Sequence, residues 1–260
     1  MKAVILAAGT CFRIRAITSS PKCLLRFNGR AILDYQLDSL KAAGVEELAI
    51  VLGYKGEEIV EHVARNHFAI LNDITFLENA RYQATNNIYS LWLAREWMSG
   101  SKTICLNADV LFHPAIIGPA VSTSADISMI VDNDYRDETM KVIIRDGYVI
   151  EMRKGIPREQ ASGTYIGVTT FGASLIGPLV REMELLLSAQ QEREFFNVAV
   201  QNLVNKGTKV SYTSTQCLPW AEVDDPGDYE FAQRFDWGGM YETFPATGIA
   251  CSSAKSYGEM

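Results

Sequence analysis

The chain has no apolar run long enough to cross a membrane. Its longest apolar stretches, such as 3–8 and 127–131, fall far short of the roughly 20 residues that span a bilayer. No signal peptide is recognisable, because no apolar h-region and cleavage site follow the first charged residue in order. The five cysteines are odd in number, scattered and free of C-x-x-C pairs, which argues against a disulfide framework or a zinc site. We therefore expect a cytoplasmic protein with no membrane partner.

Several common active-site patterns are also missing. The three histidines lie outside every motif, and no Ser/His/Asp or Cys/His arrangement can be assembled around them. The chain has neither the Gly-Lys-Ser/Thr of a phosphate-binding P-loop nor the G-x-G-x-x-G of a dinucleotide site. These absences argue against nucleophilic hydrolases, P-loop enzymes and NAD-dependent enzymes.

The charge is unevenly distributed. The 260 residues carry a net charge of −7, yet residues 1–33 contain six basic residues and no acidic one. An acidic protein is a poor general binder of nucleic acid, so we expect no nucleic-acid partner. A basic segment in an acidic chain instead suggests a compact anionic ligand near the N-terminus, although a chance fluctuation of charge gives the same pattern.

Hydrophobic periodicity predicts alternating strands and helices. Short buried-strand patterns are followed by helical patterns, and Asp146-Gly147 is typical of a hairpin turn. The predicted strands are 2–8, 48–52, 68–77, 103–106, 127–132, 140–145, 148–152, 163–171 and 209–213. The predicted helices are 32–43, 57–66, 86–98, 175–187, 195–204 and 228–234. This order predicts an α/β fold, a three-layer α/β/α sandwich with a mixed, mostly parallel Rossmann-like sheet and a β-rich insertion.

The C-terminal stretch has a different composition. From residue 237 onward the chain is rich in Gly, Ser and Thr and shows little periodicity. We expect one domain over 1–236 and a tail or linker over 237–260, which could continue into a second catalytic domain in the native chain.

The loop after the first predicted strand contains the strongest motif. It reads Leu6-Ala7-Ala8-Gly9-Thr10 and continues to Arg13, Pro21-Lys22 and Gly29. In an open α/β sheet, ligands bind where strands end. Small residues let backbone N–H groups approach a phosphate or a base, and Arg13 and Lys22 supply positive charge. The segment therefore predicts a nucleotide-binding loop.

This spaced pattern resembles the opening signature of the nucleotidyltransferases that activate sugar phosphates and phospho-alcohols with an NTP. That signature is close to L-A-A-G-x-G-x-R followed by P-K, and Cys11 stands where its second glycine is usual. The resemblance extends over about residues 1–235. It implies that Leu6, Ala7, Ala8, Gly9 and Thr10 bind the nucleotide, and that Lys22 and Arg13 are catalytic.

The resemblance also implies a metal site. In this family, an acid after the fourth strand and another near the end of the domain bind Mg²⁺, and the matching residues are Asp109 and Asp224. Mg²⁺ takes one or two carboxylates and completes its octahedron with phosphate oxygens and water. Asp225 and Asp228 are nearby alternatives, although we expect Asp228 to begin a helix. Asn107, just before Asp109, is assigned to the nucleotide.

A narrower resemblance comes from the segment between Asn79 and Ser90. Its N-x-x-Y and N-N-x-x-S-L patterns are similar to the phosphocholine and phosphonate cytidylyltransferase branch. The similarity implies that Asn79, Thr85, Asn86 and Ser90 contact the cytidine, since amides and hydroxyls offer directional hydrogen bonds to it. Asn86 could instead cap the helix that follows, and both roles are compatible.

The predicted insertion resembles the acceptor region of the same branch. The residues assigned to acceptor binding are Lys141, Lys154, Tyr165 and Trp220. Against this, lysines on strands usually point to solvent, and single aromatics are more often part of a core.

The predicted reaction is the transfer of CMP from CTP to a small phosphonate or phosphate-monoester acceptor, with release of pyrophosphate. The chain is most similar to cytidylyltransferase domains of phosphonate-antibiotic biosynthesis, which implies 2-hydroxyethylphosphonate as acceptor. Phosphocholine and sugar 1-phosphates are alternatives. A nucleotide-sensing subunit without turnover is a further alternative, which the joint presence of Arg13, Lys22, Asp109 and Asp224 disfavours.

Overall fold

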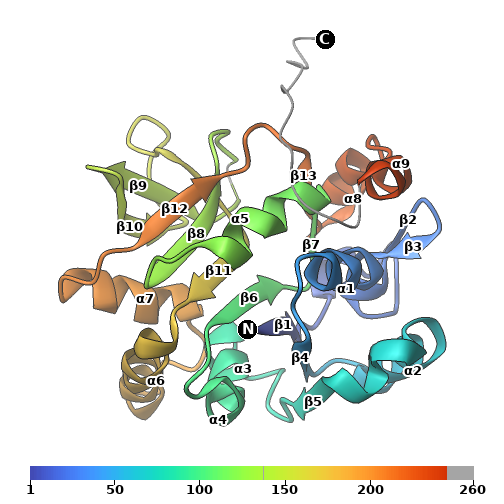
Figure 1. Ribbon diagram of the computed structural model, residues 1–260, viewed down its shortest axis with the longest axis horizontal. Coiled ribbons are helices and arrows are strands. Elements are labelled where there is room, and N and C mark those ends of the chain that lie inside the picture. The colour runs from blue at the N-terminus through green and yellow to red at the C-terminus, as the bar shows by residue number, and fades with distance from the viewer. Residues whose placement is uncertain (137, 245–260) are drawn as a thin grey trace.

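The computed structural model describes residues 1–136 and 138–244, and the account below concerns these residues. Its centre is a nine-stranded sheet in which β10, β9, β11, β6, β1, β4 and β5 follow one another, while β8 pairs with β11 and β12 (Figure 1). The predicted α/β class and mixed sheet are confirmed. The predicted tail begins inside a helix, because Trp237–Thr243 form α9 and the Trp237 side chain is fully buried. The rest of the predicted tail, 245–260, and Asp137 lie outside the described residues.

The strands fall into a parallel and a mixed half. The parallel half consists of β6 (Thr103–Asn107), β1 (Lys2–Ala7), β4 (Glu47–Leu52) and β5 (Ile74–Glu78). The mixed half consists of β8 (Ile127–Asp132), β9 (Lys141–Arg145), β10 (Tyr148–Arg153), β11 (Gly163–Phe171) and β12 (Ser211–Ser214). Two small ribbons pair β2 (Arg26–Phe27) with β3 (Arg30–Ala31), and β7 (Val110–Phe112) with β13 (Trp220–Glu222).

Helices cover both faces of the sheet. One face packs on α1 (Ile32–Ala42), α2 (Gly56–Asn66) and α5 (Ile117–Ser122). The other packs on α3 (Asn87–Leu93), α4 (Arg95–Met98), α6 (Ala173–Ser188) and α7 (Phe196–Asn205). Near one end lie α8 (Pro226–Ala232) and α9. Short 3-10 turns complete the described chain: η1 (Phe12–Ile14), η2 (Lys22–Leu24), η3 (Phe68–Asp73) and η4 (Pro114–Ile116).

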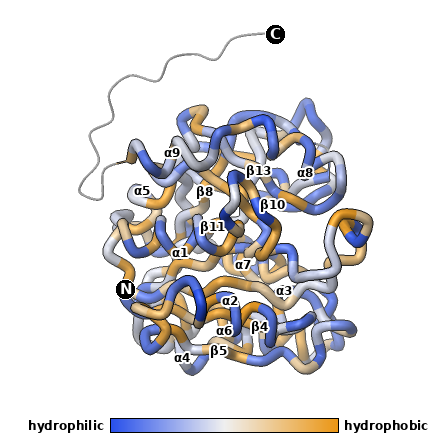
Figure 2. The backbone as a smooth tube through the Cα atoms, turned by 90° about the vertical axis from the view of Figure 1, so that its right-hand side faces the viewer, coloured by the Kyte–Doolittle hydropathy of each residue, from blue (hydrophilic) through white to orange (hydrophobic). Residues whose placement is uncertain are grey.

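The central strand explains the two cores. In β1, the side chains of Ala3, Ile5 and Ala7 join the core under α1 and α2, and those of Val4 and Leu6 join the core under α3 and α6. Successive side chains of a strand point to opposite faces, so a strand covered on both faces is apolar throughout. In Figure 2, much of the backbone inside the molecule is orange, and blue segments are frequent at its edge.

Two predicted elements differ from the structure, and some short elements were not predicted. The first part of the predicted strand 68–77 is the 3-10 turn η3, which buries no residue, so the strand begins only at Ile74. The predicted helix 86–98 is interrupted at Ala94, where ψ is 0° and the chain passes from α3 to α4. The strands β7 and β13 were not predicted, because three-residue ribbons are too short to show a periodic pattern.

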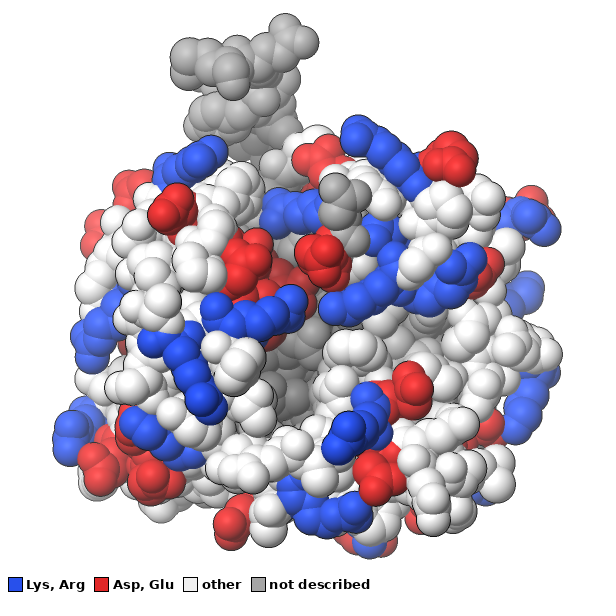
Figure 3. All heavy atoms as spheres, turned by 180° about the vertical axis from the view of Figure 1, so that it is seen from behind, with Lys and Arg blue, Asp and Glu red and all other residues white. Residues whose placement is uncertain are grey.

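No helix in the described part of the chain is long and apolar enough to cross a bilayer. The surface mixes basic and acidic side chains, and one face is hollowed near its middle (Figure 3).

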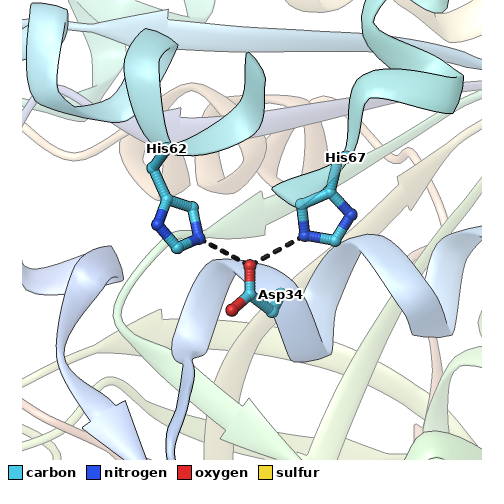
Figure 4. A group of neighbouring side chains, drawn as sticks. All are labelled: Asp34, His62 and His67. Carbon is cyan, nitrogen blue, oxygen red and sulfur yellow. Dashed lines mark hydrogen bonds and ion pairs between the residues drawn. The ribbon is translucent and has the colours of Figure 1, made fainter. Parts of the chain in front are cut away.

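A buried carboxylate joins α1 to α2 (Figure 4). Asp34 Oδ1 lies 2.6 Å from His62 Nε2 and 2.7 Å from His67 Nε2, and Asp34 Oδ2 accepts the Ala31 N–H at 2.8 Å. Burial alone would raise the pKa of Asp34, but the hydrogen bonds from His62, His67 and Ala31 outweigh it and hold that pKa well below its usual range. The two short N···O distances are those of hydrogen bonds, so the group acts as a clasp between two helices.

We expect Asp34→Asn to lower the free energy of unfolding by about 1–3 kcal/mol at pH 7, since buried hydrogen-bond partners lose an ionised acceptor. A carboxyl group whose pKa is depressed by folding stabilises the protein above its unfolded pKa, about 3.9, and this contribution is lost as pH falls toward the folded pKa. The difference between the two proteins in urea unfolding is therefore expected to shrink below about pH 4. Asp73→Asn, at an exposed carboxyl, is the control. A difference that does not depend on pH would contradict the clasp.

Candidate active site

A cleft of about 400 Å³ lies where β1 and β6 end. It takes side chains from the loop after β1, the segment between β5 and α3, the end of β6, the insertion strands and the N-terminus of α7. Its lining residues are Leu6, Ala8, Gly9, Thr10, Arg13, Lys22, Asn79, Tyr82, Gln83, Thr85, Asn86, Asn87, Ser90, Asn107, Asp109, Met140, Lys154, Tyr165, Gly167, Phe195, Asn197, Glu222 and Asp224. The face that is hollowed in Figure 3 carries both basic and acidic side chains around the hollow.

Most residues predicted from the sequence line this cleft. Ala7 lies instead in a smaller adjoining pocket of about 200 Å³, together with Cys11 and Cys23. Lys141 and Trp220 do not line the cleft. Residues that were not predicted also line it, and they are Tyr82, Gln83, Asn87, Met140, Gly167, Phe195, Asn197 and Glu222.

The loop after β1 turns at Cys11, whose backbone is left-handed with φ 57° and ψ 23°. Glycine adopts this conformation without strain, which explains why glycine is usual at this position of the motif. The Cys11 thiol is buried, and its Sγ accepts the Lys22 N–H at 3.1 Å. The cysteine therefore ties the loop to the lysine, so the turn is kept without the glycine.

Lys22 lies between two carboxylates. Its Nζ is 3.4 Å from Asp109 Oδ2 and forms a short ion pair with Asp224, which is also bound by Arg13. Burial would lower the pKa of Lys22, but the charges of Asp109 and Asp224 raise it. Burial would raise the pKa of Asp224, but Lys22 and Arg13 lower it, whereas burial and the Asp224 charge raise the pKa of Asp109 against the effect of Lys22.

The β7–β13 ribbon brings the two aspartates together. Glu222 pairs with Val110, and the Val223 N–H donates to the Asp109 carbonyl at 2.9 Å. Asp228 Oδ2 accepts the Asp224 N–H at 2.9 Å, and Asp225 caps α8. The two alternative ligands are thus engaged in the helix cap, and Asp224 is the acid of this segment that faces Lys22.

Glu222 is a third carboxylate in the cleft. Burial, followed by the negative charges of Asp109 and Asp224, raises its pKa to about 8, while the charge of Lys154 opposes this rise. In the sequence, the one feature that could have indicated Glu222 as a cleft residue was its position two residues before Asp224. Alternate residues of an extended segment point to the same side.

In the cleft, Asp109 and Asp224 could hold a divalent metal. They offer hard oxygen donors from two neighbouring strand ends, which suits Mg²⁺. Both carboxylates reach the same cation, the Lys22 ammonium, so their oxygen atoms converge on one positively charged group. The donor chemistry therefore fits the predicted metal.

The segment predicted to bind cytidine is held by its own hydrogen bonds. Asn79 Nδ2 lies 3.1 Å from both Thr85 Oγ1 and Ser90 Oγ, and Asn79 Oδ1 accepts the Arg81 N–H at 2.9 Å. Asn86 caps α3 by accepting the Asn87 N–H at 2.8 Å. These residues shape one wall of the cleft, and the helix cap anticipated for Asn86 coexists with its position in the lining.

The residues predicted to bind the acceptor separate into two pairs. Lys154 and Tyr165 line the cleft. Lys141 is only 2% exposed, and its Nζ donates to the Lys154 carbonyl at 2.7 Å. Lys141 therefore holds the backbone of Lys154 in place. Trp220 is also 2% exposed, and the Arg136 guanidinium lies 3.9 Å from its ring centroid. Burial in the ribbon between β7 and β13 keeps Trp220 out of the lining.

Gly167, with φ +85°, permits close packing in the cleft wall. A Cβ at this position would lie 3.0 Å from both Asn107 Nδ2 and Val110 Cγ2. A larger residue would push against Asn107, which lines the cleft beside Asp109.

Comparisons with known proteins agree with this geometry. Residues 3–163 match the family model of the MobA-like NTP transferase domain. The chain is 25% identical over 260 residues to CTP:phosphoglutamine cytidylyltransferase of Campylobacter jejuni, covering 88% of this chain and 98% of that protein. It is 28% identical over 241 residues to CMP-5'-(3-aminopropyl)phosphonate synthase of Streptomyces rubellomurinus, covering 88% of this chain but 37% of that protein.

A solved structure shares the fold. The inositol-1-phosphate CTP transferase from T. maritima superposes with a TM-score of 0.77 at 22% identity, covering 96% of this chain and 98% of that one.

Cys11→Gly is expected to change the free energy of unfolding by less than about 1 kcal/mol, because relief of the left-handed backbone offsets loss of the buried thiol. Cys11→Val should lower it by about 2 kcal/mol or more, since a β-branched residue is strained at this φ. Urea unfolding measures both. Cys217→Gly is the matched control, because Cys217 has φ 60° but an exposed side chain. If Cys11→Gly raises the free energy of unfolding as much as Cys217→Gly does, the hydrogen bond from the Lys22 N–H to Cys11 Sγ contributes nothing to stability.

Proposed function

The chain belongs to the family of MobA-like NTP transferase domains, and on that premise we propose that it transfers CMP from CTP to a small acceptor that ends in a phosphate or phosphonate group. Pyrophosphate is the second product. The single observation that supports this most strongly is the cluster of Lys22 and Arg13 with Asp109 and Asp224 at the strand ends of the cleft. The names of the two sequence relatives support CTP as the nucleotide.

The chemistry needs no nucleophilic side chain. An acceptor phosphate has a second pKa near 6, so it is largely dianionic at neutral pH and can attack the α-phosphorus of CTP directly. An acceptor oxygen forms the new P–O bond while the bond to the pyrophosphate oxygen breaks. The protein has to place the two anions and neutralise their charge. Lys22 is placed to stabilise the α-phosphate, and Arg13 the leaving pyrophosphate.

The charges lining the cleft favour a metal ion as an additional cation. Its charged residues are the basic Arg13, Lys22 and Lys154 and the acidic Asp109, Glu222 and Asp224. A triphosphate and a phosphonate together would bring several more negative charges than these three cations can neutralise. A Mg²⁺ ion held by Asp109 and Asp224 would supply positive charge to the phosphate oxygens.

One aromatic residue of the cleft argues against phosphocholine as acceptor. A quaternary ammonium group binds the open faces of aromatic rings. Phe195 lines the cleft, but the Lys154 Nζ already lies 5.2 Å from its ring centroid. We therefore place 2-hydroxyethylphosphonate first among the acceptors and keep phosphocholine as an alternative.

The first experiment measures pyrophosphate release with Mg²⁺ and CTP, UTP or dTTP against a panel of acceptors: 2-hydroxyethylphosphonate, 2-aminoethylphosphonate, phosphocholine and glucose 1-phosphate. We expect turnover with CTP and a phosphonate. Turnover only with UTP or dTTP and glucose 1-phosphate would overturn the cytidylyl assignment. CTP binding without release on any acceptor would support the nucleotide sensor.

In the same assay, Lys22→Ala should lower kcat/KM by about 10²–10³-fold, since it removes a cation from the reacting phosphate. Lys41→Ala, at an exposed lysine, is the control, and full activity of Lys22→Ala would exclude the catalytic role.

Lys141→Met tests the support of Lys154. The substitution keeps an apolar stem of similar length and removes the donor to the Lys154 carbonyl. We expect KM for the acceptor to rise about tenfold, because a misplaced Lys154 binds the phosphonate less well, while KM for CTP stays unchanged. Lys209→Met, on the surface, is the matched control. An unchanged acceptor KM in a folded Lys141→Met protein would contradict this role.

A further inference from the structure

The N-terminus of α7 opens into the cleft. Phe195, the residue before the helix, and Asn197, in its first turn, both line it. The Phe196 N–H donates to Asn87 Oδ1 at 2.9 Å, which fixes the start of α7 against the start of α3. The first turn of a helix presents N–H groups and a partial positive charge, so it favours an oxygen-bearing or anionic ligand.

Asn197 has an unsatisfied donor at this point. Its side chain is only 4% exposed, and its Nδ2 has no hydrogen-bond partner among the described residues. A buried amide that lacks a partner is unfavourable, and nearly all buried polar groups in folded proteins are paired. A buried donor that lines a substrate cleft is explained if the substrate supplies the missing acceptor atom.

The surroundings of Asn197 indicate which substrate this is. Lys154 stands at the ring of Phe195, two residues before Asn197 in the chain. The hydroxyl of Tyr165, another lining residue, accepts a hydrogen bond from Thr169 Oγ1 at 2.8 Å. A lysine ammonium, a primary amide donor and a helix N-terminus all favour oxygen atoms over cationic groups.

We propose that Asn197 is an acceptor-binding residue whose Nδ2 donates a hydrogen bond to an oxygen of the acceptor, beside Lys154. This inference rests on the proposed function and extends it to the choice of acceptor. The oxygen belongs either to the phosphonate group or to a hydroxyl of its organic arm. In both cases the site selects against an acceptor that presents a cation to α7.

Two substitutions in the full chain test this. Asn197→Leu keeps the volume and removes the donor, and Asn197→Asp keeps the shape and replaces the donor by a carboxylate. With 2-hydroxyethylphosphonate, we expect kcat/KM for the acceptor to fall about tenfold or more in Asn197→Leu and further in Asn197→Asp, while KM for CTP stays within about twofold. Asn205→Leu, at the exposed end of the same helix, is the matched control.

Thermal unfolding separates binding from a structural role. Because Asn197 Nδ2 makes no hydrogen bond within the described chain, Asn197→Leu should leave Tm unchanged or raise it. Ethylphosphonate, which lacks the hydroxyl, distinguishes the two oxygen sources. If the penalty of Asn197→Leu persists with ethylphosphonate, the phosphonate oxygen is the partner, and if it disappears, the arm hydroxyl is.

Three results would overturn the inference: an unchanged acceptor kcat/KM in both variants, an equal rise in KM for CTP, or a loss of activity that follows a loss of Tm. Failure of the proposed function looks different, because the wild-type protein then releases no pyrophosphate with any acceptor. In that case, calorimetric titration of 2-hydroxyethylphosphonate into the wild type and Asn197→Leu decides, and equal affinity overturns the role of Asn197.

Discussion

The cleft depends on one shared ion pair. Lys22 reaches Asp109 and Asp224, which lie 87 and 202 residues away in the chain. Asp109 and Asp224 both face this cleft, and without Lys22 and Arg13 their carboxylates would repel each other in a partly buried place. On the proposed function, the same two cations would meet the triphosphate. The interaction that holds this site together is thus made of groups that would have to be redistributed when a nucleotide binds.

Much of the fold was predictable because it follows from local patterns. The apolar run of β1, the helical spacing in α1 with Gly44 after it, and the Asp146-Gly147 turn between β9 and β10 each depend on a few neighbouring residues. That the loop after β1 lines the cleft was predictable for another reason, since a spaced set of small and basic residues after a strand has few alternative uses. The resemblance to the family then suggested that Asp109 and Asp224 act together. Their separation in the sequence alone would not have suggested this.

The rest depends on contacts between distant segments. Lys141 and Trp220 were assigned to the acceptor, but pairing of β9 with β10 and of β7 with β13 buries them beside the cleft. Asn197 gives no signal in the sequence, because an asparagine in the first turn of a helix is an ordinary residue. Only the arrangement of α7 against α3 makes its amide part of a cleft wall. Side-chain direction, and not residue type, was the missing information.

The β7–β13 ribbon has a consequence for how the protein is made. Synthesis runs from the N-terminus, so the loop after β1, β6 and Asp109 leave the ribosome well before Trp220–Glu222. The parallel half of the sheet can be paired while the second aspartate is still missing. Pairing of β13 with β7 is thus the step that completes the charge cluster, and a nascent chain cannot form the Lys22–Asp224 pair until almost its whole described length has emerged.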